Sequence, residues 1–473
     1  MRRRTTIALV GAATAALIMG AIPALAAPVD ILDRGPTSAP LDEPPPRQCV
    51  PTYTPPPSVG PYHGGDATYY DDVLADPSCT GIPQERMRRK ECVDGMAGMF
   101  PCRNVDLAAF VPLAEMAATW ANDIWGWTDP QTDREYALIG LGNGTGFLDV
   151  TRATRPKYLG KLPTHTASST WRDIEVVGNH AYVVSEAAGH GMQVFDLTRL
   201  RGVTEPITFT EDAWLGGFGQ AHTITANPDT EFVYINGATS GVTMCSTGGG
   251  GPIMVDVNNR ENPVLAGCNA QDGYTHDMQC VTYDGPDAAH VGAEICLGSN
   301  EDTITITDVT DKGDPVQLSR TTYPTASYVH QGWLTPNHRY FLSNDELDEL
   351  GGAVDTTTTY MWDLTDLDDP IVMGGFDHGT TSIDHNLYIK GKYAYESNYT
   401  SGVRILGTKN LGDGNMRKAG FFDLYPVADA IDFAGTWANY PFFDSGTVVA
   451  TSMEDGMFVL KPTGRIRQSL KTD

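Results

Sequence analysis

Long apolar segments and positive charge are the two features this chain has least of. After residue 27 no apolar run is long enough to cross a bilayer, so we expect no stable membrane anchor. Lys and Arg number 32 against 59 Asp and Glu, and the formal charge is −27. Because phosphate groups are bound by clustered Lys and Arg, this balance excludes nucleic acid and anionic lipid as partners.

The signatures of several enzyme classes are also missing. The chain contains no G-x-S-x-G nucleophile elbow, no P-loop and no H-E-x-x-H motif. Its eight cysteines include no C-x2-C pair of the kind found in structural zinc sites. The sequence therefore gives no support to a serine hydrolase, a kinase or a structural zinc site.

The N-terminus predicts export. Three arginines at residues 2–4 precede an apolar stretch at 7–22, and Ala-Leu-Ala at 24–26 forms a small-x-small cleavage site. We expect a signal peptide over residues 1–26; the alternative, an uncleaved anchor, is disfavoured by the weakly apolar, Ala-rich composition. Cleavage removes three of the 32 basic residues and no acid, which leaves a secreted, extracellular protein with a formal charge of −30.

All eight cysteines lie in the mature part, where export makes disulfides the default. They form an N-terminal and a central group of four. Spacing does not fix the connectivity, and other pairings remain open. We expect neighbours to pair within each group, as Cys49–Cys79, Cys92–Cys102, Cys245–Cys268 and Cys280–Cys296.

The remainder divides into a Pro-rich arm at 27–85, a repeat region at 86–462 and a polar tail at 463–473. Each repeat ends in a short apolar run, and the spacing is 43 to 60 residues. The seven runs are 146–150 (GFLDV), 192–197 (MQVFDL), 253–257 (IMVDV), 304–309 (ITITDV), 360–364 (YMWDL), 403–406 (VRIL) and 457–460 (MFVL). Units of this size predict an all-β, seven-bladed β-propeller.

Two details of the repeats carry structural predictions. The Asp that ends five of the runs is expected to cap the following turn with its own side chain. Residues 105–110 resemble the outer strand that follows each run, yet they precede the first run. They are expected to supply the last strand of the seventh blade and so close the ring.

Eight stretches of the chain are long motifs rich in rare residues. They are 92–107 (CVDGMAGMFPCRNVDL), 122–130 (NDIWGWTDP), 171–174 (WRDI), 272–277 (DGYTHD), 299–303 (SNEDT), 330–334 (HQGWL), 344–349 (NDELDE) and 383–388 (IDHNLY). Together they resemble secreted bacterial proteins of the choice-of-anchor B family, which are built of LVIVD repeats. The resemblance covers roughly residues 90–461 and implies a surface or secreted β-propeller without implying an activity. Members of that family carry C-terminal anchors, and none is visible here.

One polar position recurs at the expected start of each innermost strand. Innermost strands line the channel of a propeller, so these side chains should lie at one height around one axis. Four imidazoles with two carboxylates opposite suit one divalent metal ion of unknown identity, with Asp277 and Asp384 fixing the tautomers of the adjacent histidines. The series is Asp123, Asp173, His222, His276, His330, His385 and Trp437, at steps of 50, 49, 54, 54, 55 and 52 residues.

A structural role is the alternative for this series. Polar residues that face a propeller channel commonly bond to water and to neighbouring strands, and duplication would repeat such a bond in every blade. Two functions follow. The first is an extracellular scaffold for an unknown ligand or protein, with a cation site in its channel. The second is a metal-dependent oxidoreductase or lyase that uses the four histidines, and the sequence leaves open whether the protein is an enzyme.

The acidic group Asp345, Glu346, Asp348 and Glu349 offers a further oxygen-rich site, suited to Ca²⁺. It lacks the 12-residue loop pattern of an EF-hand with its central glycine. A solvated acidic loop is therefore expected at these positions.

Overall fold

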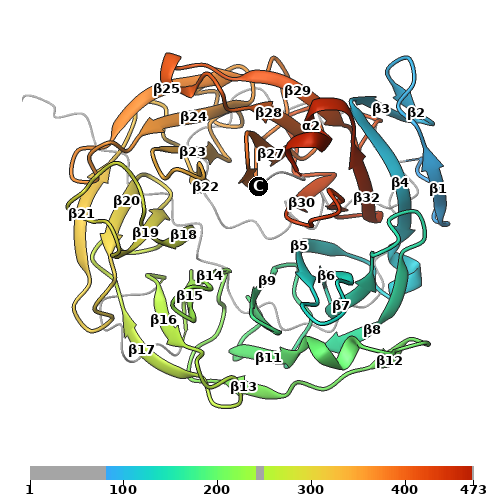
Figure 1. Cartoon of the computed structure of the whole chain (residues 1–473), viewed down its shortest axis with the longest axis horizontal. Coiled ribbons are helices and arrows are strands. Elements are labelled where there is room, and N and C mark those ends of the chain that lie inside the picture. Colours follow the sequence, from blue (N-terminus) through green and yellow to red (C-terminus); the bar gives the residue numbers. More distant parts are fainter. Residues whose placement is uncertain (1–80, 241–249, 471–473) are drawn as a thin grey trace, which may run out of the picture. The chain divides into compact units, whose positions relative to one another are not determined.

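The computed structural model describes residues 81–240 and 250–470, which form seven sheets arranged around one axis (Figure 1). The first three blades are β5 (Ala121–Thr128), β6 (Glu135–Leu141), β7 (Gly144–Asp149) and β8 (Lys157–Pro163); β9 (Arg172–Val177), β10 (His180–Ser185), β11 (Met192–Asp196) and β13 (Ala213–Leu215); and β14 (Thr223–Asn227), β15 (Phe232–Asn236), β16 (Ile253–Asp256) and β17 (Val264–Cys268). The strand β12 (Ile207–Thr208) pairs in parallel with β8 of the first blade.

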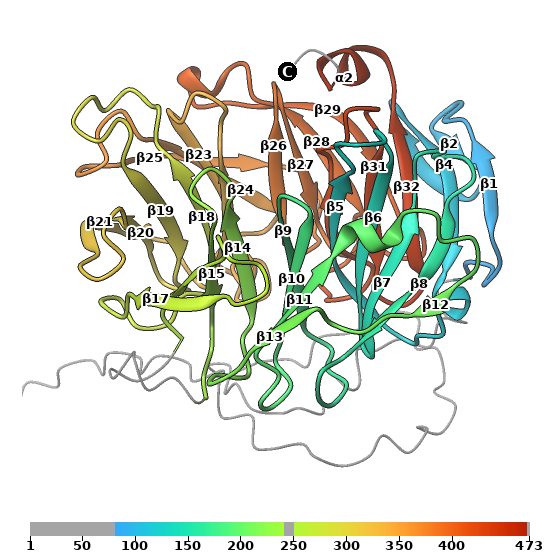
Figure 2. The same ribbon diagram turned by 60° about the horizontal axis from the view of Figure 1, so that its bottom comes forward.

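The next three blades repeat the same antiparallel order. They are β18 (Asp277–Thr282), β19 (Glu294–Ser299), β20 (Ile304–Asp308) and β21 (Val316–Thr321); β22 (Val329–Leu334), β23 (Tyr340–Asp345), β24 (Thr358–Asp363) and β25 (Ile371–Asp377); and β26 (Leu387–Lys390), β27 (Tyr393–Ser397), β28 (Val403–Gly407) and β29 (Arg417–Phe422). The first strand of each blade lies nearest the centre, and the strands of a blade stand side by side (Figure 2). The all-β, seven-bladed propeller predicted from the repeats is confirmed.

The seventh blade joins the two ends of the described chain. It consists of β30 (Thr436–Tyr440), β31 (Val448–Ser452), β32 (Gly456–Pro462) and β4 (Val105–Pro112). The strands β4 and β32 are antiparallel, with Val105 opposite Pro462 and Pro112 opposite Gly456. All eight residues of β4 are buried. The predicted closure by residues 105–110 is confirmed, and it removes the open seam that would otherwise expose β32.

The repeated aspartate performs the predicted turn-capping role. In each of the five copies its side chain accepts a hydrogen bond from the backbone N–H two residues later, at 2.8–3.1 Å. The side chain replaces a backbone turn bond as the chain leaves the third strand. The five residues are Asp149, Asp196, Asp256, Asp308 and Asp363.

The hydrophobic core lies largely between blades. Phe147 of the first blade stacks on Phe195 of the second with ring centroids 4.6 Å apart. Phe110 of β4 contacts Phe458 of β32 at 4.7 Å within the closing blade. Each blade therefore buries its apolar faces against its neighbours, and the ring as a whole is required to exclude water from them.

The segment before β4 extends two blades. It forms β1 (Met87–Lys90), which pairs with β4, and β2 (Met96–Ala97) and β3 (Phe100–Arg103), of which β3 pairs with β29 of the sixth blade. The disulfide Cys92–Cys102 ties this segment together. After β32, where a polar tail was expected, α2 (Gly464–Ser469) packs Ile466 against the core, and Leu470, directly after the helix, packs there too. Three short 3₁₀ helices complete the described elements, η2 (Leu113–Met116), η3 (Leu197–Leu200) and η4 (Leu411–Asp413).

The cysteine predictions are confirmed where the structure describes both partners. Cys280–Cys296 bridges the neighbouring strands β18 and β19, with Cα atoms 4.1 Å apart. Cys268 is disulfide-bonded, and its expected partner Cys245 lies outside the described residues. Cys49 and Cys79 also lie outside them, as do the expected signal peptide and most of the Pro-rich arm.

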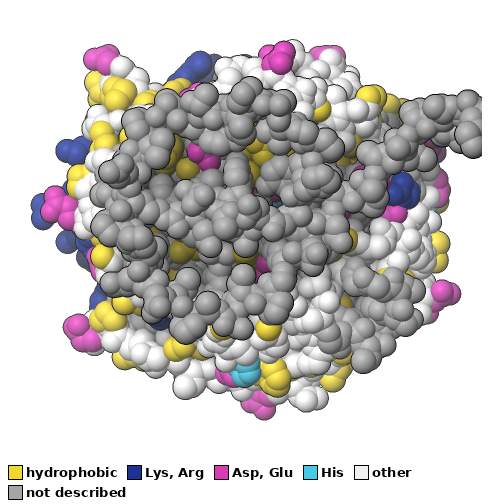
Figure 3. All heavy atoms as spheres, turned by 180° about the vertical axis from the view of Figure 1, so that it is seen from behind, with side chains coloured by type: hydrophobic (Ala, Val, Ile, Leu, Met, Phe, Trp, Pro, Cys, Tyr) yellow, Lys and Arg dark blue, Asp and Glu magenta, His cyan; other side chains and the backbone are white. Residues whose placement is uncertain are grey.

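None of the helices within the described part of the chain has the length and apolar character needed to cross a bilayer. On the face seen in Figure 3, side chains of both charge signs are interspersed around the rim, among smaller apolar patches.

Candidate metal centre

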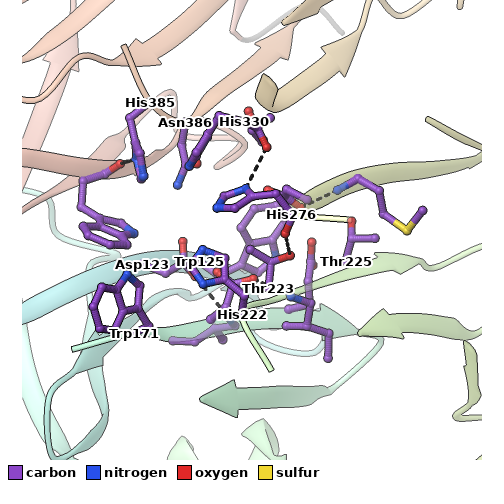
Figure 4. A pocket seen from close by; sticks show the side chains of 18 of the residues that line it. Asp123, Trp125, Trp171, His222, Thr223, Thr225, His276, His330, His385 and Asn386 are labelled. Atoms are coloured by element: carbon purple, nitrogen blue, oxygen red, sulfur yellow. Dashed lines mark hydrogen bonds between the residues drawn. The ribbon is translucent and has the colours of Figure 1, made fainter. Parts of the chain in front are cut away.

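The four ring histidines come together in the central channel. Successive ring centroids are 4.3 Å apart for His222 and His276, 4.2 Å for His276 and His330, and 4.2 Å for His330 and His385. All four line one cavity, and Figure 4 shows them facing it from four consecutive blades. The four imidazoles therefore converge around a shared axis, as the repeat spacing predicted.

The position of each histidine explains how it reaches the cavity. His222, His276 and His385 lie just before their innermost strands, and His330 lies at a register shift in β22 between Val329 and Gln331. Irregular backbone at a strand start allows two successive residues to face the same side. The residue after each histidine accordingly lines the same cavity, at Thr223, Asp277, Gln331 and Asn386.

Backbone carbonyls orient two of the rings. His276 donates from Nδ1 to the carbonyl oxygen of His330 at 2.9 Å, and His385 donates from Nδ1 to that of Trp437 at 2.6 Å. A carbonyl oxygen only accepts, so each neutral ring carries its proton on Nδ1 and leaves Nε2 as the acceptor. These bonds to the next blade are the kind expected if the histidines have a purely structural role. They also fix each ring with Nε2 free of a proton, which is the form that binds a metal.

Two carboxylates meet the row of imidazoles: Glu186 contacts Nδ1 of His222 at 2.5 Å, and Glu346 lies between His330 and His385. Oε2 of Glu346 lies 3.8 Å from Nε2 of His330, and its Oε1 lies 3.7 Å from Nε2 of His385. The hydroxyl of Tyr399 donates to Oε1 at 2.6 Å and holds the side chain in place. His330, His385 and Glu346 each offer a ligand atom, and these atoms lie within 4.8 Å of one another. From the sequence, Glu346 was expected only as part of a solvated acidic loop.

Two of the imidazoles, those of His330 and His385, are held in their neutral form. Burial, with a further contribution from the neighbouring imidazoles, keeps the pKa of His330 well below its usual value. Burial lowers the pKa of His385 to about 3. Nδ1 of His330 is buried and has no hydrogen-bond partner among the described residues. The neutral ring is the form of histidine that binds metal ions.

The two aspartates of the predicted ring lie in a second layer. Asp123 accepts from the backbone N–H of Ile174 at 3.1 Å, and Asp173 accepts from that of Ile224 at 2.7 Å. Each aspartate thus bonds to the residue that follows its equivalent in the next blade, because Ile174 follows Asp173 and Ile224 follows Thr223. Asp173 is therefore equivalent in position to Thr223 and not to His222. The expected single ring of six ligands is corrected to a layer of imidazoles and a separate layer of carboxylates.

Asp277 belongs to the carboxylate layer as well. Burial raises the pKa of Asp123, Asp173 and Asp277, and the charges of Asp123 and Asp277 raise that of Asp173 further. Asp277 accepts from the N–H of Met278, whereas Nδ1 of His276 bonds to a carbonyl. Asp384 lies with Asp348 and Glu349. Neither Asp277 nor Asp384 therefore orients a histidine through Nδ1 as expected.

The second blade places a cation at the histidine position. Since Asp173 is equivalent to Thr223, the residue before it, Arg172, is equivalent to His222. Arg172 also lines the cavity. Its guanidinium donates to Nε2 of His190 at 3.1 Å and to the carbonyl of Leu141 at 3.1 Å. His190 is fully buried and donates from Nδ1 to the carbonyl of Gly191 at 2.9 Å.

Aromatic rings fill the channel beyond the carboxylate layer. Tyr388 contacts Trp125 and Trp333 at centroid distances of 5.5 and 5.1 Å, and Phe442 lies about 6 Å from all three rings. These residues come from the first, fifth, sixth and seventh blades, so they meet across the axis. The cavity is small, with room for an ion and a few waters.

No family model matches this chain, and no curated protein matches it. Among solved structures it is similar to the computationally designed protein Ika8, with a TM-score of 0.43 and 10% identity over 72% of this chain and 82% of that chain. A likeness at this level carries no argument about function.

Proposed function

We propose that this chain is a secreted β-propeller scaffold that binds one divalent transition-metal ion in its central channel. The observation that carries the proposal is the group formed by His330, His385 and Glu346 within a buried cavity. His222 and His276 continue the same row of imidazoles and line the same cavity. Imidazole with one carboxylate suits Mn, Fe, Ni, Cu or Zn better than it suits Ca or Mg.

Export is part of the proposal. The disulfides Cys92–Cys102 and Cys280–Cys296 are compatible with an oxidising compartment, and residues 1–26 have the pattern of a signal peptide. Membership of the choice-of-anchor B family rests on the sequence resemblance alone. An extracellular ligand or protein would engage the faces or the channel mouth of the propeller.

A metal-dependent oxidoreductase is the second candidate, favoured by the carboxylate layer beside the imidazoles. Asp173 and Asp277 line the same cavity and would be available to transfer protons at a bound metal. The small volume restricts any substrate at the metal to a few atoms, such as dioxygen or peroxide. That restriction disfavours a lyase acting on a larger organic molecule.

Metal analysis of the mature chain tests the proposal. The protein is stripped with EDTA, refed separately with Zn²⁺, Mn²⁺, Cu²⁺ and Fe²⁺ and desalted, and we expect about one equivalent of at least one metal. The double variant His330→Gln with His385→Gln should retain less than about a tenth of that amount. The matched control is His180→Gln on β10, which lies outside the cavity lining and should bind as the parent does.

The result that contradicts the proposal is equally specific. If the unsubstituted protein retains less than about a tenth of an equivalent of every metal, the centre does not bind metal. Equal retention by the double variant would place the metal elsewhere in the molecule. Circular dichroism of each variant establishes that the propeller is intact.

A further inference from the structure

A second group of buried carboxylates lies beside the candidate metal centre and shares none of its imidazoles. Asp348, Glu349 and Asp384 each offer an oxygen, and these atoms lie within 4.8 Å of one another. The three residues are 0, 2 and 0% exposed. Asp348 and Glu349 follow β23 of the fifth blade, whereas Asp384 precedes β26 of the sixth. The solvated acidic loop expected from the sequence is therefore wrong, because packing against the next blade buries it.

Several of these oxygens have no hydrogen-bond donor opposite them among the described residues. Both carboxylate oxygens of Asp384 are buried without a hydrogen-bond partner among the described residues, as are Oδ1 of Asp348 and Oε2 of Glu349. None of the three forms an ion pair with Lys or Arg in the part of the chain that the structure describes. An unpaired buried carboxylate is costly, so a group of three requires a cation or shared protons.

The remaining contacts aim the free oxygens at a common point. The hydroxyl of Tyr360 donates to Oδ2 of Asp348 at 2.7 Å, and the N–H of Thr358 donates to Oε1 of Glu349 at 3.2 Å. Each of these bonds occupies one oxygen and leaves the other for a ligand. The fully buried Asp384 is directed at the same place from the neighbouring blade, with both oxygens available.

We propose that Asp348, Glu349 and Asp384 bind a calcium ion. The donor set is oxygen only, with three carboxylates, and it contains no imidazole or thiolate to favour a transition metal. Ca²⁺ accepts six to eight oxygens in flexible geometry, whereas Mg²⁺ requires a near-ideal octahedron and keeps several waters. Nearby Asp345 is not a ligand, because Tyr323, Ser327 and Tyr328 already donate to its carboxylate.

The site goes beyond the proposed transition-metal function and stands independently of it. It does have a consequence for that centre, because the loop that begins at Glu346 carries ligands of both sites, Glu346 for one and Asp348 and Glu349 for the other. A calcium ion held between Asp348 and Asp384 would fix this loop against the sixth blade. Glu346 would then be held close to His330 and His385.

Calorimetry of the full mature chain tests the calcium site. After treatment with EGTA, we expect millimolar CaCl₂ to raise the melting temperature by about 3 to 6 °C, and equal MgCl₂ to have a much smaller effect. Asp384→Asn keeps the shape of the side chain and removes its charge, so it should abolish the calcium shift. Asp308→Asn, which changes an exposed turn carboxylate, should keep the full shift.

Glu349→Gln provides a second variant should Asp384→Asn fail to fold, and it should also lose the shift. No calcium shift in the unsubstituted protein would overturn the proposal, and so would a shift that survives in both variants or an equal response to Mg²⁺. A cluster that shares protons instead of a cation would show no calcium response, and Asp384→Asn would then raise the melting temperature in calcium-free buffer. Zinc retention, measured in parallel, tests the imidazole centre separately.

Discussion

Protonation of His190 should destabilise the fold as the pH falls below neutrality. Its Nδ1–H is bonded to a carbonyl, and its Nε2 accepts from the guanidinium of Arg172. A second ring proton would point directly at that cation inside the protein. Burial first, and then the charge of Arg172, lower the pKa of His190 to about 4. The unfolded chain should titrate with the ordinary histidine pKa of about 6.5.

The sign and size of the effect follow from this difference. Between the two pKa values the unfolded state binds more protons than the folded state, so the free energy of unfolding rises with pH in that window. The contribution of neutral His190 is present above about pH 6.5 and is lost as the pH falls towards about 4, and it amounts to about 3 kcal/mol. His190→Gln keeps an acceptor for Arg172 but cannot titrate.

Urea unfolding of the metal-free protein and of His190→Gln at a series of pH values measures the effect. Other groups, including the buried carboxylates, titrate in both proteins and largely cancel in the difference. When the pH is lowered from about 7 to about 4, the free energy of unfolding of the parent should fall by about 3 kcal/mol more than that of His190→Gln. A difference that stays constant across the range would refute the assignment of a neutral, Arg172-bonded ring.

Two further predictions concern the scaffold. Phe110→Ala should lower the free energy of unfolding, measured in urea, by about 3 to 5 kcal/mol, because it leaves a cavity beside Phe458 in the closing seam. As a control, Val316→Ala changes a half-exposed side chain and should alter the free energy of unfolding by less than about 0.5 kcal/mol. Equal effects of the two substitutions would contradict the closure. Asp308→Ala should cost about 1 kcal/mol by freeing the N–H of Thr310, and a melting temperature identical to that of the parent would show that the turn does not depend on the carboxylate.

The fold was readable from the sequence because duplication preserved local signals. The third strand of every blade retained its apolar run, and the aspartate after five of these runs retained its turn-capping bond. Closure was also predictable, since residues 105–110 have the pattern of an outer strand and had no earlier blade to join. Such features depend only on neighbours along the chain or on equivalent positions in successive repeats.

The register of the channel was only half predictable. Equal spacing correctly grouped His222, His276, His330 and His385, whereas Asp123 and Asp173 were placed one residue out. Register shifts at the start of innermost strands allow two successive side chains to face the axis. The step from Asp173 is 49 residues to His222 and 50 residues to Thr223, so the spacing fits either layer. Only the backbone hydrogen bonds that each aspartate accepts show which layer it belongs to.

Glu346 and the carboxylates that follow it were beyond the reach of the repeat pattern. They lie after the second strand of one blade, and their partners His385 and Asp384 precede the first strand of the next. Composition alone assigns a sequence such as NDELDE to solvent, because an acidic side chain is rarely buried without compensation. The structure buries it against a neighbouring blade, and three carboxylates enclosed without a cation from the described residues are the observation on which the proposed calcium site rests.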